Sequence, residues 1–344
     1  MSKAASPSPR ILAARQTPNP FISVVVPCFD EEESLPELHR RVMAVLPKCT
    51  TRYELILAND GSRDATLEVI RELADADPHV VGLDLSRNFG HQACLTAALH
   101  HARGDVVLMI DADLQDPPEL LPRMLEKWRA GADVVYAVRK TRRGEGRFKL
   151  WTAALFYRLL RWATRIAIPV DTGDFRLIDR RALDAVLALR ERNRFLRGLF
   201  SWVGFRQEPI HYTRQKRFAG QTKYPLSKMV RFALDGLTSF STLPLQAAVW
   251  VGLGAAGFAF FYGLQVIYKG MQGHTVPGWA STTVSVLFLG GVQLVAIGVL
   301  GEYLGRIFEE VKARPVYLVR EVISQERNNG QPEAAPNHPT EQHT

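Results

Sequence analysis

The stretch Val106–Leu120, VVLMIDADLQDPPEL, decides the fold of this chain. Its first five residues are apolar without interruption, which predicts a strand buried on both faces, as in a parallel sheet. The two prolines near its end suit the first turn of a following helix. The carboxylates of Asp111 and Asp113 therefore stand at the C-terminal end of a buried strand, where open α/β sheets bind ligands.

Asp111 and Asp113 repel each other unless a proton or a cation lies between them. Together with the amide oxygen of Gln115 they form a set of hard oxygen donors, which is typical of a Mg²⁺ or Mn²⁺ ion that carries a diphosphate. The alternative is a capped turn, in which Asp113 or Asp116 accepts hydrogen bonds from the next helix. The strand before the motif and the prolines after it favour the metal site.

Strands and helices alternate with short connections on both sides of this motif. The apolar patterns predict strands at 21–27, 53–58, 80–85, 106–111 and 132–138, and helices at 31–46, 65–76, 91–102 and 118–129. Shorter strands at 175–178 and 205–212 flank an apolar helix at 195–203. Such alternation predicts an α/β fold with a parallel sheet and helices on both faces.

Polar side chains follow each of the first four predicted strands. They are Asp30 and Glu31, then Asp60, then Arg87 and Asn88, and finally the two aspartates of the central motif. The carboxyl ends of parallel strands meet at one edge of a sheet, so one ligand bound along that edge would explain all of them.

The chain has 344 residues, three cysteines without metal or redox spacing, and a net charge of +8. The cysteine usage predicts a reduced, cytosol-facing domain, and the N-terminus has no apolar segment of the kind found in secretory signal peptides. The bases are not spread evenly, and RKTRRGEGRFK, residues 139–149, carries six bases and one acid. Such a run is compatible with a solvated face, a nucleic-acid site or a contact with anionic lipid.

Two apolar stretches, 245–268 and 282–300, are each long enough to span a membrane. Bases flank them on the outer sides, so the positive-inside rule places both flanks and the α/β domain in the cytoplasm. Arg158, Arg161 and Arg165 form a basic stripe on a helix that either lies on the membrane surface or packs on the sheet. Nucleic-acid binding is disfavoured, because the bases cluster beside the spans.

The predicted organisation is therefore a series of six segments. They are a disordered N-terminus (1–20), a catalytic domain (21–225), an interfacial helix (226–243), two transmembrane helices (244–305), a cytoplasmic C-terminal segment (306–324) and a disordered tail (325–344). Gly301 and Gly305 have the spacing of close helix packing, which is compatible with a homo-oligomer formed through the transmembrane helices.

Several motifs stand in the order found in family 2 glycosyltransferases of the GT-A fold. They are VVPCFDEEESL, NDGSRD, SRNFG, DADLQDPPEL, DTGDFRL, GQTKY and GEYLGRIFEEVKARPVY. Within that family the chain most resembles the polyprenyl-phosphate glycosyltransferases, namely bactoprenol glucosyltransferases and dolichol-phosphate mannose synthases. Asp30 stands where an asparagine is more usual. The Gln-x-x-Arg-Trp motif of processive synthases is absent from the sequence, which argues against polymerisation.

The resemblance implies a nucleotide sugar bound along the strand edge and a Mg²⁺ or Mn²⁺ cofactor. The implied nucleotide-sugar residues are Pro27, Asp30, Glu31, Asp60, Arg87, Asn88, Asp111 and Ala112, and the implied metal ligands are Asp111, Asp113 and Gln115. Asp60 would accept a hydrogen bond from the base, although Asn-Asp-Gly is also strong turn chemistry. Asp113 would act in catalysis by holding the metal against the leaving diphosphate.

The resemblance also implies a polyprenyl monophosphate acceptor, which is mostly a dianion at pH 7 because its second pKa is about 6. Asp174 matches the position of the family's catalytic base, and we interpret its role mainly as orienting the acceptor or the sugar. Its alternative is a cap at the entry of a strand. Arg139, Arg214, Arg217 and Lys223 are the implied acceptor-phosphate ligands, since guanidinium groups pair bidentately with phosphate.

The leading hypothesis is an inner-membrane, multi-pass enzyme that moves glucose from UDP-glucose to undecaprenyl phosphate, with inversion, for cell-envelope glycans. Its rivals use GDP-mannose, UDP-N-acetylglucosamine or UDP-4-amino-arabinose as the donor. A membrane scaffold without chemistry is disfavoured, because a scaffold has no need of Asp111, Asp113 and Asp174.

Overall fold

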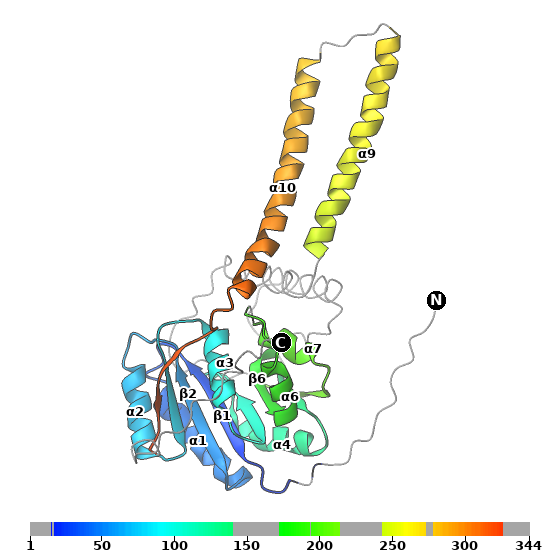
Figure 1. The fold of residues 1–344 in the computed structure, drawn as a ribbon. Coiled ribbons are helices and arrows are strands. Elements are labelled where there is room, and N and C mark those ends of the chain that lie inside the picture. Colours follow the sequence, from blue (N-terminus) through cyan, green and yellow to red (C-terminus); the bar gives the residue numbers. More distant parts are fainter. Residues whose placement is uncertain are drawn as a thin grey trace, which may run out of the picture.

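The computed structural model describes residue 15 and residues 17–139, 172–192, 194–213, 243–272 and 278–325. An α/β domain and a pair of long helices make up this part of the chain, and the helices project away from the domain (Figure 1). The basic stripe at 158–165 and nearly all of the interfacial helix at 226–243 are predictions that lie outside the described residues.

The described residues contain a sheet of eight strands in the order β7-β5-β6-β4-β1-β2-β3-β8. Its centre is four parallel strands: β1 (Ile22–Cys28), β2 (Tyr53–Asn59), β3 (Val80–Leu85) and β4 (Val106–Met109). Nearly every residue of these strands is buried, as the uninterrupted apolar runs predicted. Their C-terminal ends meet at one edge and carry the predicted polar residues.

On the side of the sheet beyond β4, one described strand runs against the others, which the alternating pattern did not reveal. β6 (Thr172–Asp179) is inserted between β4 and β5 (Val134–Arg139) and is antiparallel to both. The last strand of this side, β7 (Gln207–Tyr212), is parallel to β5. The prediction of a mostly parallel sheet is confirmed, and the reversal of β6 brings its first residues to the edge where the parallel strands end.

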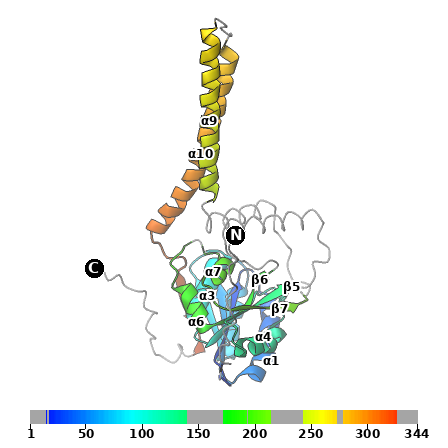
Figure 2. The same ribbon diagram turned by 90° about the vertical axis from the view of Figure 1, so that its right-hand side faces the viewer.

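Helices cover both faces of the sheet (Figure 2). One layer contains α1 (Leu35–Cys49), α2 (Thr66–Ala76), the short η1 (Pro118–Leu120) and α4 (Leu121–Arg129), and the other contains α3 (His91–His101), α6 (Arg180–Leu187) and α7 (Leu196–Trp202). Successive β1 side chains alternate between the two layers, with Val24 and Val26 in the first core and Val25 in the second.

The prediction that residues 1–20 are disordered is wrong for Arg15, which packs against the domain. Its guanidinium donates to the carbonyl of Trp128 at 2.8 Å and forms ion pairs with Asp133 and, at 3.2 Å, with Asp179. Two buried carboxylates require cations, and Arg15 supplies one while Arg181 pairs with both carboxylates at 3.0 Å.

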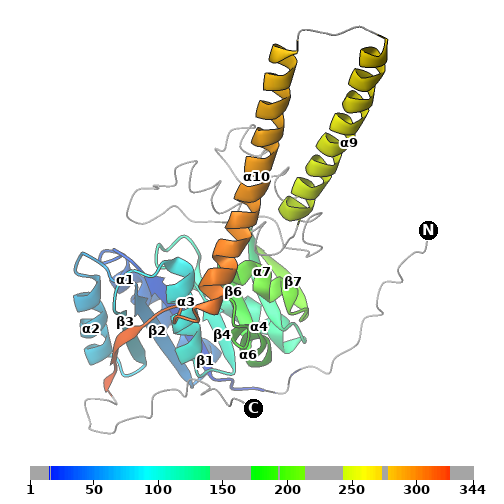
Figure 3. The same cartoon turned by 45° about the horizontal axis from the view of Figure 1, so that its top comes forward.

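Two long helices, α9 (Leu243–Met271) and α10 (Trp279–Val311), lie side by side beyond the domain (Figure 3). Both are long and apolar enough to cross a membrane, and the apolar window of each has no residue buried inside the protein. Trp250, for example, is 72% exposed. A soluble protein would bury such side chains, so these helices associate the chain with a membrane.

The predicted organisation lists residues 306–324 as a segment separate from the catalytic domain. In the structure, the chain after α10 instead becomes part of that domain. It forms β8 (Val319–Ile323), which pairs antiparallel with the exposed edge of β3. The amide of Ser86 donates to the carbonyl of Leu318 at 2.9 Å, and Arg320 forms an ion pair with Asp84 at 3.2 Å. The chain thus leaves the domain, forms the two long helices and returns to complete the sheet.

Candidate active site

The Asp-x-Asp motif forms a tight turn directly after β4. Leu114 has a φ of +58°, a conformation that bulky residues rarely adopt, yet its side chain is buried in the core. Its burial maintains a backbone conformation of the kind found at functional sites. In this turn the carboxylate of Asp113 accepts from the amide of Gln115 at 3.1 Å.

One oxygen of the Asp111 carboxylate has no hydrogen-bond donor among the described residues. This oxygen, Oδ1, is buried, and the ring of His91 lies near it, with Nε2 3.8 Å away. Burial, together with the negative charges of Asp174, Asp116 and Asp113, raises the pKa of Asp111 to about 6, although His91 opposes the shift. An oxygen in this situation fits a divalent cation.

No group of three or more His, Cys, Asp or Glu side chains within the described part of the chain has the arrangement of a metal site. Asp111 and Asp113 supply two carboxylates, and Gln115 adds an amide oxygen. Mg²⁺ is commonly held by one or two carboxylates together with substrate phosphates, so this donor set fits a metal that arrives with a diphosphate.

Asp174 lies beside the Asp-x-Asp turn because β6 runs against β4. Met109 near the end of β4 pairs with Arg176 near the start of β6, so the residues after β4 and the first residues of β6 lie at the same edge of the sheet. The Asp174 side chain is only 5% exposed and meets two cations. Arg197 donates from Nε at 2.8 Å and from Nη2 at 3.0 Å, one to each carboxylate oxygen, and Nε2 of His91 lies 3.2 Å from Oδ2.

These cations determine the charge of Asp174. Burial alone would raise the pKa of its carboxyl, but the charge of Arg197 and the hydrogen bonds from His91 and Arg197 outweigh burial and hold the pKa well below its usual range. The pKa of His91 is raised, because its hydrogen bond to Asp174 and the charge of Asp111 outweigh burial. Asp174 is therefore an ionised carboxylate at neutral pH.

Arg139, at the end of β5, lies next to Gly173, which precedes Asp174 in β6. In the register of β5 with β7 it pairs with Tyr212, and its Nε donates to the Tyr212 hydroxyl at 3.4 Å. A Cβ added at Gly173 would lie 3.1 Å from Nη2 of Arg139, so the glycine leaves room for the Arg139 guanidinium. The Tyr212 hydroxyl in turn donates to Asp116, which follows the Asp-x-Asp turn.

The residues predicted to hold the nucleoside lie where β1 and β2 end. Asp30 has a φ of +54°, which Asp and Asn tolerate better than other side chains, so the usual asparagine and this aspartate suit the same backbone. Its carboxylate accepts from the amide of Arg63 at 2.8 Å. Pro27 is buried within β1, and the carboxylate of Glu31 accepts from the hydroxyl of Ser34 at 2.7 Å.

Asp60 is buried, and its two oxygens accept from the amides of Phe89 at 2.7 Å and Gly90 at 2.9 Å. It therefore fixes the loop after β3. Gly61 has a φ of +65°, and a Cβ there would lie 2.7 Å from the backbone of Arg87, which requires glycine. The exposed Arg87 guanidinium lies over the ring of Phe89, 4.0 Å from the ring centre, so it packs against this loop.

The structure thus brings Asp111, Ala112, Asp113, Gln115, Asp174 and Arg139 to one end of the sheet, with Pro27, Asp30, Glu31, Asp60, Arg87 and Asn88 along the same edge. Arg214, Arg217 and Lys223 lie outside the described residues. Sequence reasoning missed His91, Arg197 and Tyr212. The only signal for Arg197 was a single base inside an otherwise apolar helix.

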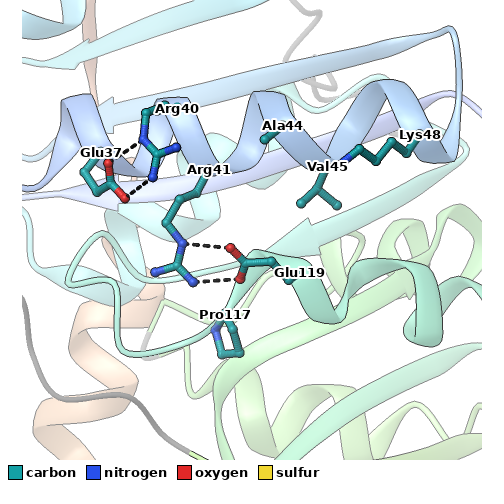
Figure 4. Close-up of a pocket in the computed structure, with 8 residues that line it drawn as sticks. All are labelled: Glu37, Arg40, Arg41, Ala44, Val45, Lys48, Pro117 and Glu119. Carbon is teal, nitrogen blue, oxygen red and sulfur yellow. Dashed lines mark hydrogen bonds and ion pairs between the residues drawn. The ribbon is translucent and has the colours of Figure 1, made fainter.

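A surface hollow of about 480 Å³ lies between α1 and the loop before η1 (Figure 4). Its walls include Arg40 and Arg41, but Arg40 is paired with Glu37 and Arg41 with Glu119, each at 2.7 Å. None of the predicted site residues that the structure describes lines it. Because both of these arginines are already paired with carboxylates, we do not assign this hollow to a charged substrate.

Comparisons with known proteins agree with this architecture. The family model Glycosyl transferase family 2 matches residues 23–187. The uncharacterized glycosyltransferase YkcC of Bacillus subtilis is 49% identical over 299 residues, covering 87% of this chain and 93% of that protein. The SfII prophage-derived bactoprenol glucosyl transferase of Shigella flexneri is 46% identical over 300 residues, covering 87% of this chain and 97% of that protein.

Among solved structures, glucosyl-3-phosphoglycerate synthase from Mycobacterium tuberculosis, in complex with Mn²⁺, UDP and glucosyl-3-phosphoglycerate, is 20% identical, with a TM-score of 0.44. The match covers 64% of this chain and 80% of that one. The matches span 93% and 97% of the length of the two relatives, YkcC and the SfII transferase. The chain therefore belongs to glycosyl transferase family 2, in its polyprenyl-phosphate glycosyltransferase group, and is a glycosyltransferase of the GT-A fold.

Proposed function

We propose that this enzyme transfers glucose from UDP-glucose to undecaprenyl phosphate, giving a β-linked glucosyl-phosphoprenol. The observation that carries the proposal is the meeting of Asp111, Asp174 and Arg139 at one edge of the sheet, in a chain with two membrane-type helices. The bactoprenol glucosyl transferases among its relatives support glucose as the sugar and a polyprenyl phosphate as the acceptor.

The donor would bind along the strand edge, with its nucleoside at Pro27, Asp30 and Glu31 and its diphosphate at Ala112 and the Asp-x-Asp turn. Asp60 would act through the loop at 86–90, where Arg87 and Asn88 face the donor. Asp111, Asp113 and Gln115 would hold Mg²⁺ or Mn²⁺, and the chemistry that the bound ion supplies is neutralisation of the charge growing on the leaving diphosphate.

The acceptor phosphate would approach from the side of Arg139, with Arg214, Arg217 and Lys223 contributing from the chain after β7. A phosphate monoester is mostly a dianion at neutral pH and is already a nucleophile. Holding it beside the donor makes the reaction effectively intramolecular. Asp174, ionised and oriented by its two cations, would order the sugar and the acceptor for attack with inversion.

We propose a multi-pass arrangement in the inner membrane with the catalytic domain (21–225) in the cytoplasm. An interfacial helix (226–243) would precede α9, and the segment after α10 would return to the cytoplasmic domain. The bases Arg306, Lys312 and Arg314 after the apolar part of α10 support this orientation by the positive-inside rule. The polyprenyl phosphate would then present its head group at the surface that the domain faces.

The test is a donor panel with the purified full-length protein, undecaprenyl phosphate and either Mg²⁺ or Mn²⁺. UDP-glucose should give a product with the mass of glucosyl-phosphoundecaprenol, and EDTA should abolish its formation. Product with GDP-mannose, UDP-N-acetylglucosamine or UDP-4-amino-arabinose alone would replace the donor assignment. Absence of lipid product with every donor would overturn the proposal.

A further inference from the structure

Asp174 meets its partners through both carboxylate oxygens. Arg197 forms a fork, with Nε on Oδ1 and Nη2 on Oδ2, and His91 contacts Oδ2 as well. A bidentate guanidinium–carboxylate pair fixes both the position and the plane of the carboxylate. With the Asp174 side chain 5% exposed and that of Arg197 27% exposed, the pair lies mostly out of water, where such contacts are strong.

The helix that carries Arg197 is fixed in two ways. Leu196 and Leu199 are buried in the core, and the backbone amide of Leu196, at the start of α7, donates to Oε1 of Gln92 at 3.1 Å. Gln92 follows His91 at the start of α3. One hydrogen bond therefore joins the two helix ends that carry the two cations of Asp174.

We propose that Arg197 is a positioning residue for Asp174, holding it as a fixed anion that takes no proton from the acceptor. This inference rests on the proposed function, because it concerns the role of Asp174 in glycosyl transfer. A proton placed on Asp174 would disrupt the fork, and a phosphate dianion has no proton that must be removed. The pKa of Asp174, held low by the charge of Arg197 against the effect of burial, supports this assignment.

The reaction then balances without proton transfer to Asp174. A phosphate oxygen of the acceptor forms the new bond to the anomeric carbon, and the bond from that carbon to the diphosphate oxygen breaks. The electron pair leaves with the nucleoside diphosphate. Asp174 contributes a fixed negative charge near a sugar on which positive charge develops. Preorganised charge of this kind is usually the largest single contribution to stabilising an enzyme's transition state.

The experiment is a double-mutant cycle of Arg197→Gln and Asp174→Asn in the full-length protein, with kcat and both KM values measured. Arg197→Gln should lower kcat by about tenfold or more, while both KM values stay within about threefold. The double variant should be no slower than Asp174→Asn alone, within about twofold, because Arg197 acts through Asp174. Arg197→Lys, which keeps the charge without the fork, should recover part of kcat.

Arg206→Gln is the matched control, since Arg206 forms an exposed ion pair with Glu208 at 2.6 Å at the opposite end of β7 from Tyr212, and its kcat should equal that of the parent. Two results would overturn the inference. One is a double variant whose loss in kcat equals the product of the losses in the two single variants, and the other is an Arg197→Gln effect confined to the acceptor KM. Thermal melting identifies an unfolded variant, for which Arg197→Lys replaces Arg197→Gln in the cycle. The parent's product tests the proposed function, whereas the ratios between variants test Arg197.

Discussion

The hydroxyl of Tyr212 joins Asp116 to Arg139. It donates to the buried carboxylate of Asp116 and accepts from Nε of Arg139, and its ring packs edge-on against Phe175 with the centroids 5.8 Å apart. This one side chain, at the end of β7, therefore connects the loop after the Asp-x-Asp turn with the proposed acceptor side of the site.

Tyr212→Phe should weaken acceptor binding and stability together. Without the hydroxyl, Asp116 loses a donor in a buried place and Arg139 loses an orienting contact, so we expect a loss of about 1–3 kcal/mol in stability. The acceptor KM should rise several-fold and the donor KM should not change. Kinetics and thermal melting measure both effects. Tyr136→Phe on β5 is the control, and equal behaviour of the two variants would contradict the role of Tyr212.

Asp113→Asn should retain the fold and lose turnover by about a hundredfold or more, because it weakens the stabilisation of the leaving diphosphate. Glucosyl-phosphoprenol formation, followed by product mass over a Mg²⁺ and Mn²⁺ titration, measures the loss. Asp184→Asn, at an exposed position on α6, should remain as active as the parent. Near-normal rates for Asp113→Asn, or full parent activity in EDTA, would remove the metal assignment.

Asp111 should make the metal-free protein less stable at neutral pH. Its pKa is raised from 3.8 to about 6, first by burial and then by neighbouring carboxylates, so the native state binds its proton more tightly than the unfolded state does. The stability that this carboxyl contributes is complete below its unfolded pKa and is lost as the pH rises through about 6.

Metal-free Asp111→Asn should therefore melt higher than the metal-free parent at pH 7.5, by about 2–4 °C, and this difference should shrink toward pH 5. Mg²⁺ or Mn²⁺ with UDP should raise the Tm of the parent much more than that of the variant. Thermal melting in detergent with EDTA, and then with the ion, provides both comparisons. A variant that melts below the parent at pH 7.5 without metal would contradict the destabilising effect assigned to the ionised Asp111.

The connection between α9 and α10 should lie on the non-cytoplasmic side of the membrane. A cysteine at Gln272, directly after α9, should react with a membrane-impermeant thiol reagent in intact cells, whereas one at Arg314, after α10, should react only after permeabilisation. The native Cys28 and Cys94 are buried, and the parent protein gives the background. Labelling in the reverse order would contradict the orientation and the cytoplasmic donor.

Local patterns predicted the four central strands and the polar residues at their ends, because uninterrupted apolar runs and short connections constrain a parallel sheet strongly. The direction of β6 could not be obtained in this way, since it depends on pairing with β4 and β5 across the sheet. His91 lies 83 residues from Asp174, so only the fold shows that they meet. β8 left little signal, because VREVI has three β-branched residues but places two charged residues side by side, which breaks the alternation of a half-buried strand.

The return of the chain to form β8 makes the catalytic unit discontinuous in sequence. A protein truncated before α9 would retain the whole of the proposed active site, yet it would lack the strand that covers β3, and Asp84 would lose its ion pair with Arg320. An uncovered, largely apolar edge strand invites pairing with other chains and aggregation. A soluble catalytic fragment should therefore be built by joining residues 315–325 to the end of the domain through a flexible linker in place of the two long helices.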